Sequence, residues 1–490
     1  MKEKLLFRRQ FIIGKNLENK LEWDKENLVD GLTLYNHADL QKESVSLGNK
    51  KLILLGYIIN PNNYKEDNRT IIEKLFENSN NFDNIKKQTI SLGGRWLLLY
   101  INNDEFKILT DPSSLRRIFY TKKDELLIGS DTSIINYFKK QELSNDPKLL
   151  EYLNSKYCEL SEFEFYNDNT IYKNIYKVLP NRYLDVKTRS VHKFWVDVEK
   201  KSYDENLEII SNILVNEIKA LYNRSNNIIC SISAGIDSRI MYAASKKAEV
   251  PIKYFVSTMN TLNEKDVDIY IPKKITKDNN DDFIILDNLE SFRDDFLEIY
   301  EMNIENARKL PKNLTIQAIL DKFDNPYVIT GNNAEVIVHY YDKDDVKYGK
   351  EISKLLGIPD DITYFNESFQ AWLDEARPFL DKHKDIVPMK LFHWEQDTGN
   401  WGTLYQAESD IASEEFPPFN NREIFLRFWQ CSKEKNYGKE EVYRDLLAKL
   451  DKSLLEYPIN PLNFKEKIRE FIRNNLSHTN YIKLKLFLKR

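Results

Sequence analysis

The fold of this chain is decided by the stretch Asn226-Asn227-Ile228-Ile229-Cys230-Ser231-Ile232-Ser233-Ala234-Gly235-Ile236-Asp237-Ser238-Arg239. Its apolar run predicts a short buried strand, its small residues predict a tight loop, and residues 239–247 predict a helix. A strand, loop and helix in this order place several backbone N–H groups and the positive end of a helix around one anion-sized hollow. An ordinary turn between a strand and a helix is the simpler interpretation.

The side chains of this loop suit a phosphate group. Ser233 and Ser238 can donate hydroxyl hydrogen bonds to phosphate oxygens, and Asp237 offers the carboxylate that a phosphate-bound Mg²⁺ needs. No lysine stands at the start of the helix, so the loop is not a Walker A loop. The predicted phosphate-binding residues of the loop are Ser231, Ser233, Ala234, Gly235, Ile236, Asp237 and Ser238.

Size and composition exclude several classes of protein. The chain has 490 residues, and its formal net charge of −5 gives no global basic field for nucleic acid. Its three cysteines, Cys158, Cys230 and Cys431, are too far apart for a disulfide scaffold, a zinc site or a redox pair. The apolar runs are strand-length, and the first residues are too short in their apolar part for a signal peptide. We therefore expect a cytoplasmic protein without an integral membrane segment.

The pattern of apolar residues changes at about residue 200. Before it, strands are predicted at 52–58, 96–101, 106–109, 118–120, 126–128 and 183–186, with few clear helices. After it, helix 207–221 and strands 228–232, 252–256, 283–286 and 327–330 alternate with helices, which favours a doubly wound parallel sheet. Pro272 predicts a late start or a kink in one of these helices. We expect domains at 1–195 and 200–490, the second ending in a helical tail.

Five segments of the first half occur in a recognisable order. They are Gly93-Gly94-Arg95-Trp96, Thr110-Asp111-Pro112-Ser113-Ser114, Ile128-Gly129-Ser130-Asp131, Leu179-Pro180-Asn181-Arg182-Tyr183-Leu184 and Phe194-Trp195. In this order they resemble the amino-terminal, glutaminase-type domain of asparagine synthetases. Likewise, the loop resembles the Ser-Gly-Gly-x-Asp-Ser motif of ATP-pyrophosphatases, which split ATP to AMP and pyrophosphate, with Ala234 replacing the first glycine. The resemblance implies an N-terminal β-sandwich flanked by helices, then a PP-loop synthetase domain.

Two later segments extend the resemblance. Thr330-Gly331-Asn332-Asn333-Ala334-Glu335-Val336 resembles the family motif Ser-Gly-Glu-Gly-x-Asp-Glu, and Phe416-Pro417-Pro418-Phe419-Asn420-Asn421-Arg422 resembles Arg-x-Pro-Phe-Leu-Asp. The first match implies that Thr330 and Gly331 lie at the nucleotide and that Glu335 joins Asp237 as a Mg²⁺ ligand. The changes at Ala234, Asn332, Asn333 and Val336 also suit a catalytically inactive scaffold or binding subunit.

One departure from the family concerns glutamine. Glutaminases of this type use an amino-terminal cysteine as nucleophile, whereas this chain begins Met1-Lys2-Glu3 and its first cysteine is Cys158. We therefore expect no glutaminase activity. The amine would be free, supplied as ammonia or already part of the substrate, as in family members that form β-lactam rings or close lasso peptides.

The remaining chemistry is the activation of a carboxylate by ATP and Mg²⁺. Adenylation turns a poor electrophile into one with AMP as leaving group, and the site must stabilise the charge that develops. Ser257 would lie near the adenine. Glu395 or Asp397 could be the general base, and Lys439 could stabilise the transition state, although carboxylates such as Glu395 and Asp397 are more often solvated helix charges. Arg239 is either a phosphate ligand or an ordinary helix-start residue.

The sequence thus predicts an AMP-forming carbon–nitrogen ligase that couples a carboxylate to an amine or to ammonia. The carboxylate could belong to a small molecule, a peptide or a glycan, and a homodimer is compatible with the sequence. An inactive relative and a nucleotidyl transferase, which would stop at an adenylated product, are the alternatives. Magnesium-dependent ATP binding separates the first alternative, and product analysis separates the second.

Overall fold

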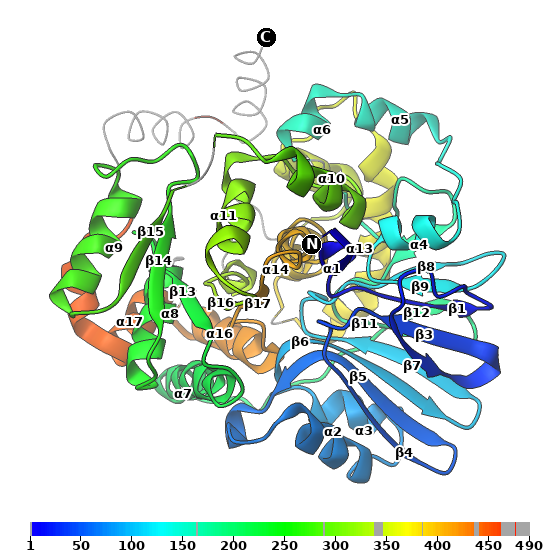
Figure 1. Ribbon diagram of the computed structural model, residues 1–490, viewed down its shortest axis with the longest axis horizontal. Coiled ribbons are helices and arrows are strands. Elements are labelled where there is room, and N and C mark those ends of the chain that lie inside the picture. Colours follow the sequence, from blue (N-terminus) through cyan, green and yellow to red (C-terminus); the bar gives the residue numbers. More distant parts are fainter. Residues whose placement is uncertain are drawn as a thin grey trace.

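A computed structural model describes residues 2–162, 165–287, 290–337, 346–384, 386–435, 441–461 and 476. Within these ranges the chain forms two antiparallel sheets followed by one parallel sheet (Figure 1). The first antiparallel sheet has the order β10-β8-β9-β1-β3-β2 and the second has the order β12-β11-β7-β6-β5-β4. The predicted β-rich first part of the chain and the parallel sheet that follows it are confirmed.

The bounds of the strands are as follows. The first sheet consists of β10 (Ile175–Lys177), β8 (Phe119–Thr121), β9 (Leu127–Gly129), β1 (Phe11–Lys15), β3 (Leu32–Asn36) and β2 (Asp24–Asn27). The second consists of β12 (Ser190–Lys193), β11 (Arg182–Asp185), β7 (Glu105–Thr110), β6 (Gly93–Asn102), β5 (Lys50–Ile59) and β4 (Lys42–Leu47). The parallel sheet has the order β15 (Phe283–Leu286), β14 (Lys253–Ser257), β13 (Ile228–Ser231), β16 (Tyr327–Ile329) and β17 (Glu414–Phe416).

The two antiparallel sheets stack face to face, because apolar side chains from both sheets meet in one core. In β5, Ile53 and Leu55 point into the core between the sheets. Leu52 and Leu54 point the other way, against α2 (Asn68–Glu77) and α3 (Phe82–Gln88). On the outer face of the first sheet, α4 (Thr132–Phe138) packs through Ile134 and Ile135. The result is a sandwich with a helix layer on each side.

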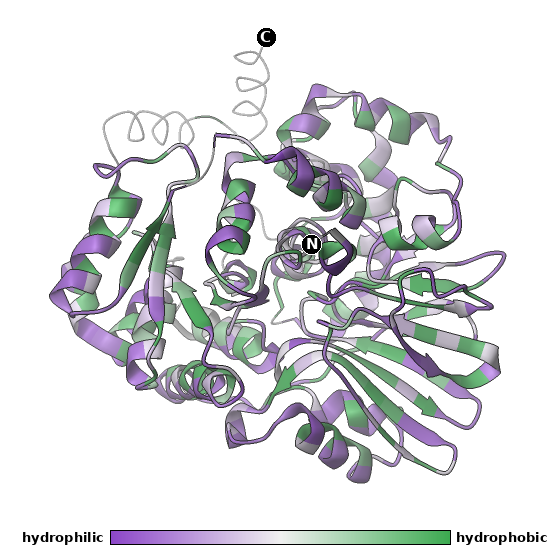
Figure 2. Ribbon diagram, in the orientation of Figure 1, coloured by the Kyte–Doolittle hydropathy of each residue, from purple (hydrophilic) through white to green (hydrophobic). Residues whose placement is uncertain are grey.

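Helices also cover both faces of the parallel sheet. Cys230 of β13 faces α7 (Tyr203–Tyr222), α8 (Ile236–Lys247) and α17 (Glu441–Asp451). Its neighbour Ile229 faces α10 (Asp294–Asn303) and α11 (Leu314–Lys322). Strands buried on both faces read as continuous apolar runs, as β13 does. Hydrophobic residues are concentrated in the sheets, whereas the outward faces of the helices are hydrophilic (Figure 2).

The remaining helices lie before the parallel sheet, between its strands and after β16. They are α1 (Lys2–Leu5), α5 (Pro147–Leu153), α6 (Lys156–Leu160), α9 (Val267–Asp278), α12 (Gly349–Leu355), α13 (Tyr364–Lys382), α14 (Pro388–Phe392), α15 (Thr403–Ser409) and α16 (Arg422–Lys435). A π-helix at His393–Gly402 joins α14 to α15. No helix in the described part of the chain is both long and apolar enough to span a bilayer.

One detail of the parallel sheet differs from the sequence-based expectations, and one agrees. The helix that contains Pro272 begins only at Val267, in keeping with a late start, and continues through the proline to Asp278. The sheet also gains a fifth strand, β17, which pairs in parallel with β16. The acidic pair Glu414 and Glu415 conceals this strand in the sequence, because charged residues seldom occupy buried strands.

Candidate active site

A cavity of about 530 Å³ opens at the carboxyl ends of β13, β14, β16 and β17. The chain passes from β13 to β14 on one side, whereas β16 lies on the other side of β13. The strand order therefore reverses between β13 and β16, and ligands of doubly wound sheets bind at such a switch point. The cavity is the default candidate for a ligand site on topology alone.

The loop after β13 forms the floor of this cavity. Its two serine hydroxyls lie 2.9 Å apart, and Ser233 N–H donates to Ser238 Oγ over 3.0 Å. Helix α8 begins after Gly235, which provides no side-chain cap for the first N–H groups of the helix. Those N–H groups carry the positive end of the helix dipole. The floor of the cavity thus presents hydroxyls and a helix N-terminus, as an anionic ligand requires.

Two other residues of the loop turn away from the cavity. Ala234 is buried, and its N–H donates to Asp268 Oδ1 over 3.0 Å. Arg239 is also buried and donates to the carbonyl oxygens of Ala234 and Tyr457, over 3.0 and 2.9 Å. Arg239 therefore fastens the loop to the chain after α17 and is not placed as a phosphate ligand.

The carboxylates of Asp237 and Glu335 both line the cavity. Gly331 brings their segments together, since a Cβ at Gly331 would lie 2.9 Å from Asp237 Cβ. Burial, with the neighbouring charge of Glu335, raises the pKa of Asp237 to about 7. Burial also raises the pKa of Glu335. Two desolvated carboxylates that disfavour each other's charge are the arrangement that a bound cation would relieve.

The described residues supply only part of a cation's coordination shell. No group of three or more His, Cys, Asp or Glu side chains in the described ranges is arranged to hold a metal. Mg²⁺ is commonly bound through one or two carboxylates, waters and the phosphates of a nucleotide. The pair Asp237 and Glu335 fits that mode and does not fit a site built from protein ligands alone.

The cavity has an apolar wall beside β14 and α11. Ser257 lies in the apolar part, beside Val256, Met259 and Ile316, and its hydroxyl contacts Thr315 Oγ1 at 2.7 Å. Such a wall suits the flat, largely apolar face of a nucleobase. The serines and carboxylates lie beyond it, in the place where the phosphates of that nucleotide would fall.

The sequence analysis missed Glu415, a third carboxylate of the cavity. It lies on β17, is 2% exposed, and accepts hydrogen bonds from Thr330 Oγ1, over 2.8 Å, and from Asn332 Nδ2. Burial raises the pKa of Glu415 to about 7. Side chains alternate along a strand, so the preceding Glu414 points away from the cavity. The acidic pair in the sequence gave no sign that its members face different surroundings.

Glu414 instead joins the edge of the parallel sheet to the antiparallel sandwich. It pairs with Arg95 at 2.9 Å and with Arg116, while Asp410 pairs with the same two arginines at 3.0 and 3.1 Å. All four residues are buried. Removing one member of a buried ion cluster leaves an uncompensated charge. The cluster therefore fixes β17, and with it the position of Glu415 in the cavity.

Most of the predicted nucleotide-binding residues meet at this cavity. It is lined by Ser231, Ser233, Gly235, Asp237, Ser238, Ser257, Thr330, Gly331 and Glu335. Ala234 and Ile236 are not among its lining residues, because Ala234 is buried and Ile236 packs against the core below the loop. Lys439 lies outside the described residues.

Glu395 and Asp397, the predicted general bases, do not line the cavity. Glu395 is fully buried and pairs with Lys193 at 2.9 Å and Arg182 at 3.3 Å. Burial alone would raise the pKa of Glu395, but these two cations outweigh it and hold the pKa below its ordinary value. Asp397 pairs with His393 on the π-helix at 2.7 Å. Both carboxylates therefore form ion pairs outside the cavity.

Comparisons with known proteins leave the family open. No family model and no curated protein sequence matches the chain. Among solved structures, similarity extends to glutamine-dependent NAD+ synthetase from Acinetobacter baumannii in complex with ADP, at 19% identity and a TM-score of 0.21. It extends to NMN synthetase from Francisella tularensis, at 18% identity and a TM-score of 0.19.

A third similar structure is glutamine phosphoribosylpyrophosphate amidotransferase from B. subtilis, complexed with ADP and GMP, at 10% identity and a TM-score of 0.26. The match to the NAD+ synthetase covers 34% of this chain and 32% of that chain, and that to the NMN synthetase covers 34% and 75%. The match to the amidotransferase covers 72% of this chain and 84% of that chain. At these scores the likeness establishes neither family nor activity.

Proposed function

We propose that this protein is an ATP- and Mg²⁺-dependent, AMP-forming amide synthetase. It would adenylate a carboxylate and couple it to an amine or ammonia without hydrolysing glutamine. Residues 1–195 would form a glutaminase-like domain without glutaminase activity, and residues 200–490 would form the asparagine synthetase-like synthetase domain. The acceptor belongs to the class of small-molecule, peptide or glycan carboxylates.

One observation carries the proposal: Asp237 and Glu335 share a cavity with the serines of the loop at the N-terminus of α8. Mg²⁺, when bound with ATP, would neutralise phosphate charge and stabilise the pyrophosphate that leaves. Asp237 and Glu335 would hold the cation in their ionised forms. Ser233 and Ser238 would donate to phosphate oxygens, and the wall beside Ser257 would receive the adenine.

The cavity also offers a base for the second half-reaction. Glu415 lines the cavity and has a pKa near neutrality, which suits a group that accepts a proton from an attacking amine at physiological pH. The amine nitrogen would form the new C–N bond, AMP would leave with the electrons of the broken C–O bond, and the amine proton would pass to Glu415. We propose Glu415 for the role assigned from sequence to Glu395 and Asp397.

A cation near the reacting carboxylate would stabilise the adenylation transition state. Among the described residues that line the cavity, Lys312 is the only lysine or arginine. Its ammonium lies 3.0 Å from Glu162 and 4.7 Å from the ring centre of Trp401. Lys312 is therefore a candidate beside Lys439, the residue proposed from the sequence.

The burial of the three cysteines supports a reaction that does not hydrolyse glutamine. Cys158, Cys230 and Cys431 are all fully buried. Burial raises the pKa of Cys158 to about 11. A thiol nucleophile must be accessible and readily ionised, and none of the three meets the first condition.

The proposal is tested by ATP–pyrophosphate exchange over a panel of amino acids, peptides and uronic acids, with and without Mg²⁺. Exchange that requires one class of carboxylate, and is lost in Asp237→Asn, supports adenylation. Mg²⁺-dependent ATP binding followed by a stable AMP-modified product would instead indicate a nucleotidyl transferase. Absence of any ATP binding by the folded protein would leave the scaffold interpretation.

A further inference from the structure

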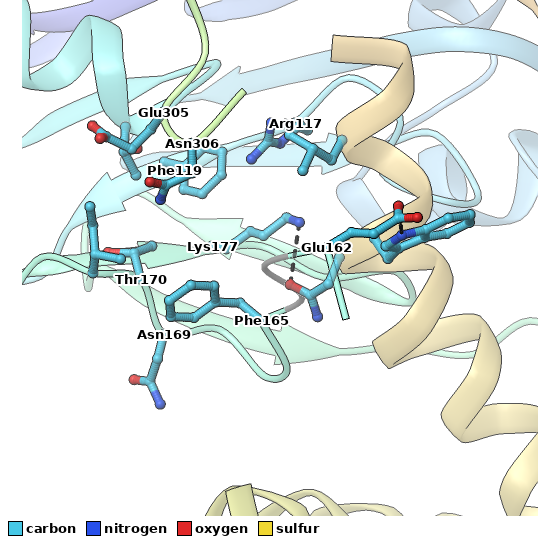
Figure 3. Close-up of a pocket in the computed structure, with 14 residues that line it drawn as sticks. Arg117, Phe119, Glu162, Phe165, Asn169, Thr170, Lys177, Glu305 and Asn306 are labelled. Atoms are coloured by element: carbon cyan, nitrogen blue, oxygen red, sulfur yellow. Dashed lines mark hydrogen bonds between the residues drawn. The ribbon is translucent and has the colours of Figure 1, made fainter. Parts of the chain in front are cut away.

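A second cavity, of about 80 Å³, lies between the first antiparallel sheet and the π-helix (Figure 3). Phe119 of β8 and Lys177 of β10 line it from the sheet, and Asn400 and Trp401 line it from the π-helix. One water molecule requires on the order of 10–15 Å³ on this scale, so the cavity has room for several waters or for a small organic molecule. Trp401 also lines the larger cavity.

Lys177 is the notable residue of this cavity. It is 4% exposed and extends among Arg117, Phe119 and Phe165 (Figure 3). Among the described residues its ammonium donates to Asn400 Oδ1, at 3.4 Å, and to Thr403 Oγ1, at 3.2 Å, two long contacts with neutral oxygens. Burial, with Arg117 nearby, lowers the pKa of Lys177 well below its ordinary value. A buried ammonium is costly unless an anion pairs with it.

The other charged residues of the cavity already have partners. Arg117 lies 2.9 Å from Asp131. Glu162 lies 3.0 Å from Lys312, and Glu305 accepts a hydrogen bond of 2.6 Å from Tyr172. Within the described part of the chain, no carboxylate forms an ion pair with Lys177. Lys177 is therefore the cation of the lining without a carboxylate in contact among the described residues, whereas Arg117 has one.

We propose that this cavity binds a short-chain carboxylate, with its oxygens at the Lys177 ammonium and its alkyl part against the apolar walls. One ammonium group suits a monoanion better than a phosphate dianion. The side chains of Phe119, Ile171 and Leu404 offer those walls, and burying an alkyl chain there is favourable. This inference is independent of the proposed function.

The test is calorimetric titration of the full chain with propionate at fixed ionic strength. Propionamide, which is neutral and of the same shape, is the matched ligand. We expect saturable binding of propionate but not of propionamide. Lys177→Met should weaken propionate binding by at least about tenfold, as expected when a hydrogen-bonded ionic contact is lost. The control Lys123→Met removes an exposed lysine and should leave binding unchanged.

Two further readouts separate this site from the larger cavity and from a structural role. Lys177→Met should retain Mg²⁺-ATP binding, and without propionate it should melt no lower than the native chain, since it removes an unmatched buried charge. The proposal is overturned if propionate does not bind, if propionamide binds equally well, or if Asp237→Asn rather than Lys177→Met abolishes binding. A lower melting temperature of Lys177→Met would also overturn it, by making Lys177 a packing residue.

Discussion

Replacing Asp237 by asparagine should stabilise the nucleotide-free protein at alkaline pH while abolishing Mg²⁺-ATP binding. Asp237 is desolvated beside Glu335, which raises its pKa from 3.8 to about 7. As pH rises above 3.8, the unfolded chain ionises first, and the native state loses stability until pH exceeds its own pKa. Asparagine carries no charge, so the variant escapes this loss.

The magnitude follows from the pKa. Because one pKa unit corresponds to about 1.36 kcal/mol, the rise from 3.8 to about 7 costs the folded state at most about 4 kcal/mol above neutrality. Asp237 is only partly buried and lines an open cavity, so screening reduces the cost. Loss of the carboxylate at the first turn of α8 removes about 0.3–1 kcal/mol of favourable helix-dipole interaction. We expect a net gain of about 1–2 kcal/mol at about pH 8 and none near pH 4.

The assay is thermal and urea denaturation of both proteins across this pH range, without nucleotide or Mg²⁺. Asp294→Asn is the matched control, because Asp294 occupies the first turn of α10 but is exposed. It should lose a little stability and gain none. If Asp237→Asn were less stable than the native chain at alkaline pH, or gained stability equally at every pH, the account of a repulsive carboxylate pair would be wrong.

Three further substitutions test the assignment of residues to the cavity or away from it. Gly331→Ala should weaken Mg²⁺-ATP binding at least about tenfold in a calorimetric titration, because the new Cβ would crowd the first turn of α8. The control Gly402→Ala changes another glycine of the same cavity. It should leave binding unchanged, because its Cβ would lie 3.5 Å from the nearest atom. Glu415→Gln should retain ATP–pyrophosphate exchange but lower amide formation by about 10²–10⁴-fold, and equal loss of both reactions would refute its role as a base. Glu395→Gln should lower the free energy of unfolding by about 3 kcal/mol, because it weakens a buried ion cluster. Its affinity for nucleotide should not change. Loss of nucleotide binding by the folded variant would show that Glu395 belongs to the binding site.

Much of the fold could be predicted because its signals are local. The apolar runs of β5, β6 and β13 predict strands buried on both faces. The alternation of strands with helices after residue 200 predicts a parallel sheet. Strand β17 could not be predicted, since its residues Glu414 and Glu415 are charged. Only the tertiary structure supplies the arginines that pair with Glu414 and the polar groups that surround Glu415.

In the candidate site, too, local sequence patterns could be interpreted, whereas tertiary contacts could not be predicted. The loop from Ser233 to Ser238 is contiguous, so its geometry follows from a strand, small residues and a helix. Gly331 and Glu335 follow the neighbouring strand β16 and arrive at the same edge of the sheet. Glu395 could not be placed from sequence, because periodicity does not tell which face of a helix meets the cavity. Here the π-helix turns it toward Arg182 and Lys193 of the sandwich.

The most direct test of the central claim is a calorimetric titration with an α,β-methylene analogue of ATP, with and without Mg²⁺. It should be made on the native chain and on Asp237→Asn, both verified to be folded. The account predicts saturable binding that requires Mg²⁺ and is lost in the variant. Binding that is equally tight without Mg²⁺ or in the variant, or no binding by the native chain, would contradict it.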